Sequence, residues 1–403
     1  VDARDVGVDL ELADDDYEGG RPLKGVYTMI SIVLGTRPET IKMSPIIREC
    51  ETRNLDYFIL HSGQHYSYDM DRAFFEDLEL PEPKYNLDVG SGTQAGQTAK
   101  IMTGIEDILV KESPGIILVQ GDTNTVMTGA LAAAKLHIRV GHVEAGLRSF
   151  DRTMPEEINR VVADHVSDYL FAPTETARQY LLNEGIEENK ICVTGNTIVD
   201  AVFQNREIAK KGADILDTLG LEPQGYFLVT SHRQENVDNP EKLRSIIAGL
   251  EAVHREYSLP VIFPMHPRTR KMVERFGVSL DGISVMSPAG FLEFLQLESN
   301  ARLVLTDSGG VQEETCILGV PCVTLRENTE RPETIEVGGN MLVGTDFERI
   351  REGVRTMLAR SADWTNPYGD GTAGGMITTI CAGIRRSVNG ATQGCSTPPV
   401  VEP

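Results

Sequence analysis

Hydrophobic residues along the chain fall into short runs that alternate with longer amphipathic segments. Runs of about five residues rich in Ile, Leu and Val, without alternating polar positions, are typical of strands buried on both faces. The segments between them, such as 94–110 and 125–136, have the spacing of helices that cover a sheet. The pattern predicts an α/β protein with mainly parallel sheets and helices on both faces. The predicted strands are 30–34, 57–61, 115–119, 138–142, 168–172, 191–194, 226–230, 261–265, 302–306 and 320–325.

The strands form two series, separated by a charged segment at 207–225 that Gly and Pro interrupt. We therefore expect two domains, at 29–206 and 207–370. Residues 1–28 are acidic and poor in apolar side chains, and residues 388–403 are rich in Gly, Ser, Thr and Pro. Such compositions do not support a packed core, so we expect a disordered leader and a disordered tail.

The charge and composition of the chain argue against nucleic-acid and membrane partners. The 403 residues carry a formal net charge of −22, which argues against a nucleic-acid ligand because phosphate binding needs a basic surface. No apolar run approaches the ~20 residues that span a bilayer, so we expect no membrane association. The six cysteines are scattered without metal-ligand spacing, which is typical of thiols in a reducing compartment. These features predict a cytoplasmic protein.

Three acidic residues follow the predicted strands in the first domain. Asp122 comes just after 115–119 and Glu144 just after 138–142, at the carboxyl ends of neighbouring parallel strands where α/β proteins bind ligands. Glu156 follows Pro155 near the start of a helix. Each acid alone would suit a helix cap or a solvated loop. Three at one sheet edge favour general acid/base chemistry, because their environments can set their pKa values apart.

Two strand-to-helix turns have the chemistry of anion sites. The first, at 35–42, combines a glycine and a helix start with Arg37 and Lys42, although it lacks the GxGxxG pattern of dinucleotide sites. The second is Ser308-Gly309-Gly310, whose small residues let backbone N–H groups approach a phosphate. With Arg331 one strand later, it predicts a diphosphate site.

Seven motifs occur in a fixed order: GTRPETIKMSP, GDTNTV, GHVEAGLRS, MPEEINR, TSHRQEN, LTDSGGVQEE and ENTERPE. Together with NPYGDGTA they closely resemble the non-hydrolysing UDP-N-acetylglucosamine 2-epimerases, from about residue 29 to about residue 386. The resemblance implies two Rossmann-like domains of the glycosyltransferase-B type, with an active site in the cleft between them. It also implies that a last helix, at 371–387, crosses back to the first domain.

The resemblance further implies a reaction and the residues that perform it. Such enzymes interconvert UDP-N-acetylglucosamine and UDP-N-acetylmannosamine without a cofactor or a metal, by eliminating UDP and adding it back to a 2-acetamidoglucal. They commonly form homodimers. By matched motif, the catalytic residues are Asp122, Glu144, Glu156 and His232. The matched contacts to the UDP-sugar substrate are Arg37, Lys42, Phe294, Ser308, Gly309, Gly310, Glu314 and Arg331.

Several other functions are compatible with these motifs. Enzymes of the same fold epimerise diacetamido-uronic acid nucleotides or hydrolyse the UDP-sugar. A retaining glycosyltransferase would need the nucleotide site but not the three acids, and a non-catalytic UDP-sugar sensor would need neither the acids nor His232. A loss of activity without a loss of UDP binding in Asp122→Asn or Glu144→Gln would separate the epimerase from the glycosyltransferase, and the complete set of acids with His232 argues against the sensor.

Overall fold

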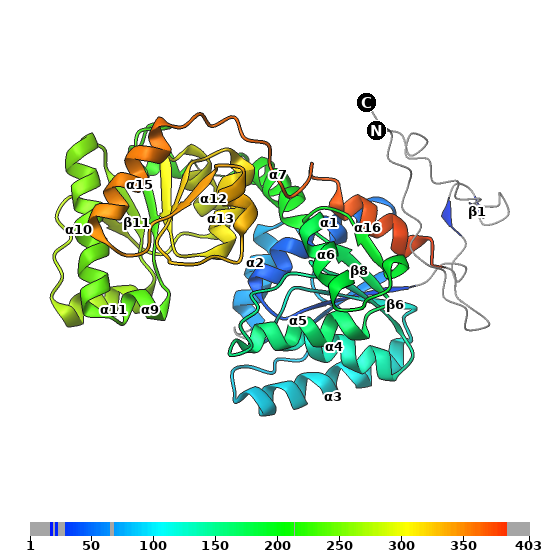
Figure 1. Cartoon of the computed structure of the whole chain (residues 1–403). Helices are drawn as coiled ribbons and strands as arrows, with labels where there is room; N and C mark the ends of the chain where they lie inside the picture. Colours follow the sequence, from blue (N-terminus) through cyan, green and yellow to red (C-terminus); the bar gives the residue numbers. More distant parts are fainter. Residues whose placement is uncertain (1–16, 19–20, 23–28, 65–67, 213, 385–403) are drawn as a thin grey trace. The chain divides into compact units, whose positions relative to one another are not determined.

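The computed structural model describes residues 17–18, 21–22, 29–64, 68–212 and 214–384 (Figure 1). The chain divides into two compact units. Val202–Tyr368 forms the second unit, and the described residues before and after it form the first. Helix α7, Thr197–Ala209, runs from the first unit into the second. The predicted boundary after residue 206 therefore falls inside a helix.

The first unit is built on a seven-stranded parallel sheet with the order β5-β4-β3-β6-β7-β8-β9. Its first long strand, β3, lies between β4 and β6, so the chain moves across the sheet in opposite directions on the two sides of β3. Ligands of open α/β sheets bind where the strand order reverses in this way. The strands are β3 Ile30–Leu34, β4 Tyr57–His61, β5 Tyr85–Asn86, β6 Ile116–Gln120, β7 Arg139–Val143, β8 Tyr169–Ala172 and β9 Ile191–Val193.

Helices cover both faces of this sheet. Figure 1 shows α3, α4 and α5 side by side on one face, with α1 and α16 packed together on the other. Buried Val33, Ile117 and Val119 of the strands meet buried Ile101 and Ile105 of α3 in one core cluster. The helices are α1 Arg37–Thr52, α2 Tyr68–Asp77, α3 Gln94–Glu112, α4 Asn124–Lys135, α5 Pro155–Val166, α6 Glu175–Asn183, the 3-10 helix Glu188–Lys190 and α16 Ala373–Ala382.

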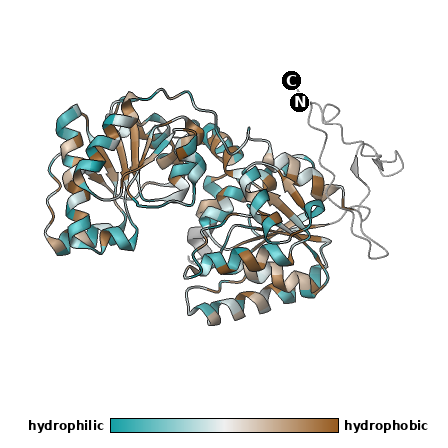
Figure 2. Ribbon diagram, in the orientation of Figure 1, coloured by the Kyte–Doolittle hydropathy of each residue, from teal (hydrophilic) through white to brown (hydrophobic). Residues whose placement is uncertain are grey.

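The second unit repeats this plan with a six-stranded parallel sheet in the order β12-β11-β10-β13-β14-β15. Its first strand, β10, lies between β11 and β13, so the strand order of this sheet also reverses at its first strand. The strands are β10 Phe227–Thr230, β11 Val261–Pro264, β12 Ile283–Met286, β13 Leu303–Thr306, β14 Cys322–Thr324 and β15 Asn340–Leu342. The strands of both sheets are the most apolar elements in Figure 2, as expected for strands covered on both faces.

In the second unit, α9, α10, α11 and α15 cover one face of the sheet, and α8, α12, α13 and α14 lie together on the other. Each face has its own buried cluster, one around Ile246, Phe263 and Val354 and one around Tyr226, Leu297 and Val304. The helices are α8 Ile215–Leu219, α9 Gln234–Val237, α10 Pro240–Tyr257, α11 Pro267–Phe276, α12 Phe291–Asn300, α13 Gly309–Leu318, α14 Pro332–Glu336 and α15 Phe347–Ala359.

The predicted fold class, α/β with parallel sheets covered on both faces, is confirmed. All ten predicted strands are present, with ends shifted by at most two residues. Within the two parallel sheets, the strands that the sequence did not reveal are β5, β12 and β15, short edge strands of two to four residues. Such short strands give too little pattern to recognise.

The terminal segments are described only in part. Of the predicted leader, Tyr17–Glu18 (β1) and Arg21–Pro22 (β2) form an antiparallel pair. The rest of the leader, the predicted tail at 388–403 and residues 385–387 of the predicted last helix lie outside the described residues. No helix within the described part of the chain is long and apolar enough to cross a membrane. Cys50, Cys316, Cys322 and Cys381 are free and buried.

Candidate active site

The turn after β3 brings the first predicted anion site to the sheet edge. Gly35 lies so close to the next turn that a Cβ atom there would be 2.2 Å from Thr125 Oγ1, so only glycine fits. Arg37 opens α1, and its guanidinium carbon lies 5.2 Å from the centre of the Phe74 ring. The ring supports the guanidinium through a cation–π contact.

Asp122 lies in the turn after β6. Gly121, with φ of +85°, reverses the chain, and its N–H donates to Val143 O at 3.1 Å. The Asp122 carboxylate forms an ion pair with Arg160 of α5, and its backbone carbonyl accepts from Asn159 Nδ2 at 2.9 Å. The side chain remains 32% exposed. Asp122 is therefore a charge-compensated carboxylate that a ligand can still reach.

Glu144 follows β7 in a left-handed conformation, with φ of +69°, which is uncommon outside glycine. Its carboxylate is buried, pairs with Lys42 Nζ and accepts from Gln120 Nε2 at 3.2 Å. Lys42, predicted to bind substrate, thus lies against a predicted catalytic acid. Backbone strain of this kind concentrates at functional sites.

Glu156 lies in the first turn of α5 and is exposed. Arg160, one turn later on the same helix, pairs with Asp122, so this end of α5 lies at the same sheet edge. The neighbouring Glu157 is buried and accepts from the N–H groups of Ser149 and Phe150 at 2.9 and 3.0 Å. The two adjacent glutamates differ: Glu157 holds a loop, and Glu156 is open to a ligand.

A buried ionic network supports the turns that carry Asp122 and Glu144. His142 Nδ1 is 2.6 Å from Asp164 Oδ1, and Nε2 is 2.8 Å from Gly121 O. Asp164 also pairs with Arg148 at 2.7 Å. Burial lowers the pKa of His142, but the contacts with Asp164 and Gly121 together have the larger effect, so the pKa of His142 is raised overall. Burial raises the pKa of Asp164, but His142 and Arg148 together have the larger effect, so the pKa of Asp164 is lowered overall.

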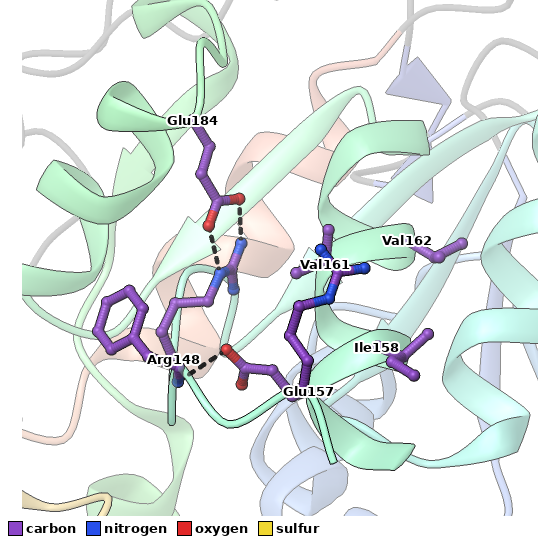
Figure 3. Close-up of a pocket in the computed structure, with 8 residues that line it drawn as sticks. Arg148, Glu157, Ile158, Val161, Val162 and Glu184 are labelled. Carbon is purple, nitrogen blue, oxygen red and sulfur yellow. Dashed lines mark hydrogen bonds and ion pairs between the residues drawn. The ribbon is translucent and has the colours of Figure 1, made fainter. Parts of the chain in front are cut away.

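A cavity of about 250 Å³ lies on another side of α5 (Figure 3). A buried arginine, Arg148, lines this cavity and pairs with Asp164 at 2.7 Å. Arg148 also donates to both carboxylate oxygens of Glu184 at 2.7 Å, which the dashed lines in Figure 3 mark. Arg148 is therefore fully occupied by the fold. The cavity contains none of the predicted site residues; its lining is Arg148, Phe150, Arg152, Glu157, Ile158, Val161, Val162 and Glu184.

In the second unit, His232 lies in the turn after β10 and is 47% exposed. Its Nδ1 is 3.2 Å from Asp307 Oδ1, in the turn after the neighbouring strand β13. Asp307 is fully buried and also accepts from the His232 and Arg233 N–H groups, the Ser231 hydroxyl and Asn236 Nδ2. Burial raises the pKa of Asp307, but the hydrogen bonds and charge of His232 outweigh it, so the pKa is lowered. Asp307 thus fixes both the loop and the ring of His232.

The second predicted anion turn starts α13. Ser308 is the N-cap, and Gly309 and Gly310 are the first helical residues. A Cβ at Gly309 would come no closer than 3.9 Å to a neighbour, and one at Gly310 no closer than 4.0 Å. The fold therefore does not require glycine at either position. The space above these N–H groups suits an anion at a helix amino terminus.

The remaining predicted nucleotide contacts surround α13. Arg331 Nε lies 2.6 Å from Glu313 Oε1, and its Nη1 donates to Glu330 O at 3.0 Å. Glu314 is nearly buried on α13, and Phe294 of α12 packs against the same core cluster as Val311. These residues all belong to the second unit, whereas Arg37 and Lys42 belong to the first.

Three buried acids were not predicted from the sequence. Glu39 accepts three hydrogen bonds at the edge of the first sheet, Asp307 holds His232, and Glu298 lies fully buried near Glu314. The capping-box spacing from Thr36 to Glu39 was a usable signal, but it indicates only a helix start. Among the described residues, no group of His, Cys, Asp and Glu could hold a metal ion.

Comparison with known proteins places this geometry in context. Residues 48–382 match the family model described as UDP-N-acetylglucosamine 2-epimerase. The chain is 56% identical over 359 residues to the UDP-N-acetylglucosamine 2-epimerase of Methanocaldococcus jannaschii, covering 87% of this chain and 98% of that protein. It is 42% identical over 358 residues to the UDP-2,3-diacetamido-2,3-dideoxy-D-glucuronate 2-epimerase of Pseudomonas aeruginosa, covering 88% and 99% of the two chains.

A solved structure agrees with the sequence match. The crystal structure of the Methanocaldococcus jannaschii enzyme in complex with UDP-GlcNAc and UDP superimposes with a TM-score of 0.79. That match covers 87% of this chain and 99% of the other, again at 56% identity.

Proposed function

The chain belongs to the UDP-N-acetylglucosamine 2-epimerase family, and from this we propose that it interconverts UDP-N-acetylglucosamine and UDP-N-acetylmannosamine. The observation that carries the proposal is the group of acids at the edge of the first sheet. Asp122 and Glu144 follow adjacent strands, and Glu156 opens the helix whose Arg160 pairs with Asp122. The second unit offers a glycine-rich helix start that suits a diphosphate.

The chemistry explains the need for several proton-transfer groups. The C2 proton of the sugar is not next to a ketone, so simple enolisation is not available. We propose that a carboxylate removes this proton while the C1–oxygen bond breaks and its electron pair leaves with UDP. The product of this step is 2-acetamidoglucal. UDP then adds back to C1 as a second acid delivers a proton to the opposite face of C2.

In this proposal Asp122, Glu144 and Glu156 handle the protons. Arg160 and Lys42 compensate the charges of the first two, so that two carboxylates coexist at one edge. Arg37 lies at a helix start near them and would assist the departing phosphate. The reaction calls for no redox cofactor and no metal.

The second unit would hold UDP. N–H groups of the Ser308-Gly309-Gly310 turn and Arg331 suit the diphosphate, Glu314 the ribose hydroxyls and Phe294 the uracil. His232, held by Asp307, would contact the leaving phosphate or the sugar. We further propose that the enzyme retains UDP during the cycle, acts as a homodimer and resides in the cytoplasm.

Incubation with UDP-N-acetylglucosamine in deuterated water tests this function. NMR should show UDP-N-acetylmannosamine with deuterium at C2. An isotopic label in the oxygen between C1 and the β-phosphorus should scramble among the terminal oxygens of the β-phosphate, because the C1–oxygen bond breaks and re-forms. Deuterium without scrambling would indicate another route to the C2 carbanion. Retention of the C2 hydrogen in all products would exclude proton transfer, and release of free sugar would identify a hydrolysing enzyme.

A second substrate has support from one relative. The Pseudomonas aeruginosa protein, 42% identical over nearly its full length, is named as a 2-epimerase of a diacetamido-uronic acid nucleotide. The same proton chemistry would serve both substrates, and only the groups around C3 and C6 of the sugar differ. Comparing kcat/KM for the two nucleotide sugars decides between them, since the preferred substrate gives the larger value.

A further inference from the structure

Each sheet has a point of reversal, and at each one a buried carboxylate joins the two loops that diverge there. In the second unit these loops follow β10 and β13, and Asp307 joins them. In the first unit the corresponding loops follow β3 and β6. The carboxylate there is Glu39, a residue outside the set of proposed catalytic and binding groups.

Glu39 is only 3% exposed and uses both carboxylate oxygens. Oε2 accepts from the N–H groups of Gly35, at 2.5 Å, and Thr36, at 3.0 Å, in its own loop. Oε1 accepts from the hydroxyl of Thr123, in the loop after β6. Thr123 directly follows Asp122, and Thr36 directly precedes Arg37. Glu39 therefore links the segment that carries Arg37 to the segment that carries Asp122.

A helix cap alone does not account for this arrangement. Glu39 is the third residue of α1 and its bond to Thr36 N is that of a capping box. The same device occurs in α12, where Glu293 accepts from Gly290 N at 2.9 Å. Glu293, however, is exposed and caps only its own helix. Glu39 is buried and also holds a second loop, which a cap does not require.

We propose that Glu39 is a positioning residue for epimerisation: by joining the loops after β3 and β6 it fixes Arg37 and Asp122 relative to one another. The proposal rests on the proposed function, in which Arg37 assists the departing phosphate and Asp122 takes part in proton transfer. A small displacement of either group misaligns the C2 proton and the breaking C1–oxygen bond. Misplacement by about 1 Å can cost about 100-fold in rate.

The link depends on the charge of Glu39. As a carboxylate it accepts from all three donors at once, whereas a neutral acid must turn one oxygen into a donor. Burial raises the pKa of Glu39 to about 7, and the charge of Asp122 adds to this rise. The hydrogen bonds from Thr123, Gly35 and Thr36 act in the opposite direction but do not cancel it. The other charged groups at this edge are Arg37 and Lys42 of α1, Arg160 of α5 and Glu144. The arrangement is therefore complete above pH 7 and altered below it.

The test compares Glu39→Gln with wild type across pH 6 to 9, using the full chain and UDP-N-acetylglucosamine. Glutamine has the same shape but carries no charge. We expect kcat to fall about 10- to 100-fold above pH 7, and the deficit to shrink below pH 7, where wild type loses the carboxylate as well. The Kd of UDP should change by less than about threefold, because the proposed nucleotide contacts lie mainly in the second unit. Glu293→Gln, the matched cap variant, should keep wild-type kcat at every pH.

Variants of Thr123, which donates to Glu39, provide a second test. Thr123→Val removes the hydroxyl and should lower kcat as Glu39→Gln does, while Thr123→Ser keeps the hydroxyl and should restore most of it. The double variant should lose little more than either single one, because both remove the same link. Thr123 Oγ1 also caps α4 by accepting from Val126 N at 3.4 Å. If Glu39→Gln does not fold, the pH profile of Thr123→Val still decides the matter, because loss of the link gives a deficit that shrinks below pH 7 and loss of the cap gives one that does not depend on pH.

Three outcomes overturn the proposal: wild-type kcat in Glu39→Gln, a deficit independent of pH, or additive losses with Thr123→Val. If instead the proposed function is wrong, wild type itself gives no epimer, so this result is distinct from the three outcomes above. In that case a double-mutant cycle on thermal unfolding of the same four proteins still measures the Glu39–Thr123 link without substrate. Additive changes in Tm would show that the link does not exist.

Discussion

At the residue scale, identical side chains in this protein take different roles because their surroundings differ. Glu156 is exposed, Glu157 holds a loop, and Glu144 pairs with a buried lysine. Asp307 and Glu298 are both fully buried, yet only Asp307 is surrounded by donors. Their environments shift the two pKa values in opposite directions.

The Asp307–His232 pair yields a prediction about activity. Asp307→Asn should lower kcat by about 100-fold, because the amide no longer balances a positive charge on the ring of His232 or fixes its orientation. His232→Asn should have a similar effect, and the double variant should lose little more. Asp238→Asn, which breaks an exposed ion pair with Arg268, is the control and should leave kcat unchanged. Steady-state kinetics with UDP-N-acetylglucosamine measure all four, and additive losses would contradict a functional pair.

Glu298 yields a prediction about stability. Both of its carboxyl oxygens lack a hydrogen-bond partner among the described residues, and burial, followed by the charge of Glu314, raises its pKa well above the ordinary value. The folded protein therefore holds a proton that the unfolded chain has released. Stability should fall as pH rises above the ordinary pKa of glutamate, near 4.5.

Glu298→Gln removes that dependence. We expect the variant to gain roughly 1–3 kcal/mol over wild type at pH 8 and to differ little at pH 4.5. Urea unfolding at both pH values measures the difference, and Glu293→Gln on the same helix controls for loss of a surface charge. A gain that is equal at the two pH values would refute the account.

At the element scale, the turn at the end of each strand places the chemistry, and helices fix the turns. Helix α5 supplies Arg160 to Asp122, and α1 supplies Lys42 to Glu144. Helix α16 packs on α1 from a distant part of the chain. Its Gly374 N–H donates to Asp200 at 2.9 Å, so a buried carboxylate of α7 holds the amino end of α16.

The stability that the contact between Asp200 and α16 contributes should depend on pH. Burial raises the pKa of Asp200 to about 6, although the N–H groups of Gly374 and Ala373 oppose the rise. Because the folded pKa of Asp200 lies above the unfolded one, this carboxyl should lower the stability of wild type as pH rises from about 4 to about 6, and it should contribute no further loss above that range. Asp200→Asn should lack this step, which we expect to be roughly 2–3 kcal/mol. Denaturant unfolding at pH 4.5 and pH 7 measures it; equal wild-type and variant slopes across this range would contradict the assignment.

At the scale of the whole molecule, two units share one plan but not one core. The cluster that contains Val33 and Ile117 lies wholly in the first unit, and the two clusters around Phe263 and Val304 lie wholly in the second. The first unit is discontinuous, because the chain returns to it after Tyr368 to form α16. Units with separate cores need not unfold together.

Calorimetry should therefore show two unfolding transitions. UDP at about 100 times its Kd should stabilise the unit that binds it by about 2.7 kcal/mol, and we expect this to be the transition of the second unit. Truncation after Tyr368, which removes α16, should lower the other transition and leave the UDP-sensitive one in place. A single transition that moves as a whole with UDP would show that the units unfold as one.

The sequence by itself determined the ten predicted strands and the turns from which the candidate site residues were proposed. Buried strands and strand-to-helix turns are local patterns, so Asp122, Glu144 and the Ser308-Gly309-Gly310 turn were recognised without coordinates. Only the tertiary structure decided which charges meet. Lys42, expected to bind substrate, lies against Glu144, 102 residues away. Glu39, for which the sequence predicted no role, is buried against Thr123. The reason is physical: burial and partner choice depend on residues that only folding brings together, and these decide which acids at the site are exposed, which are paired and which are buried.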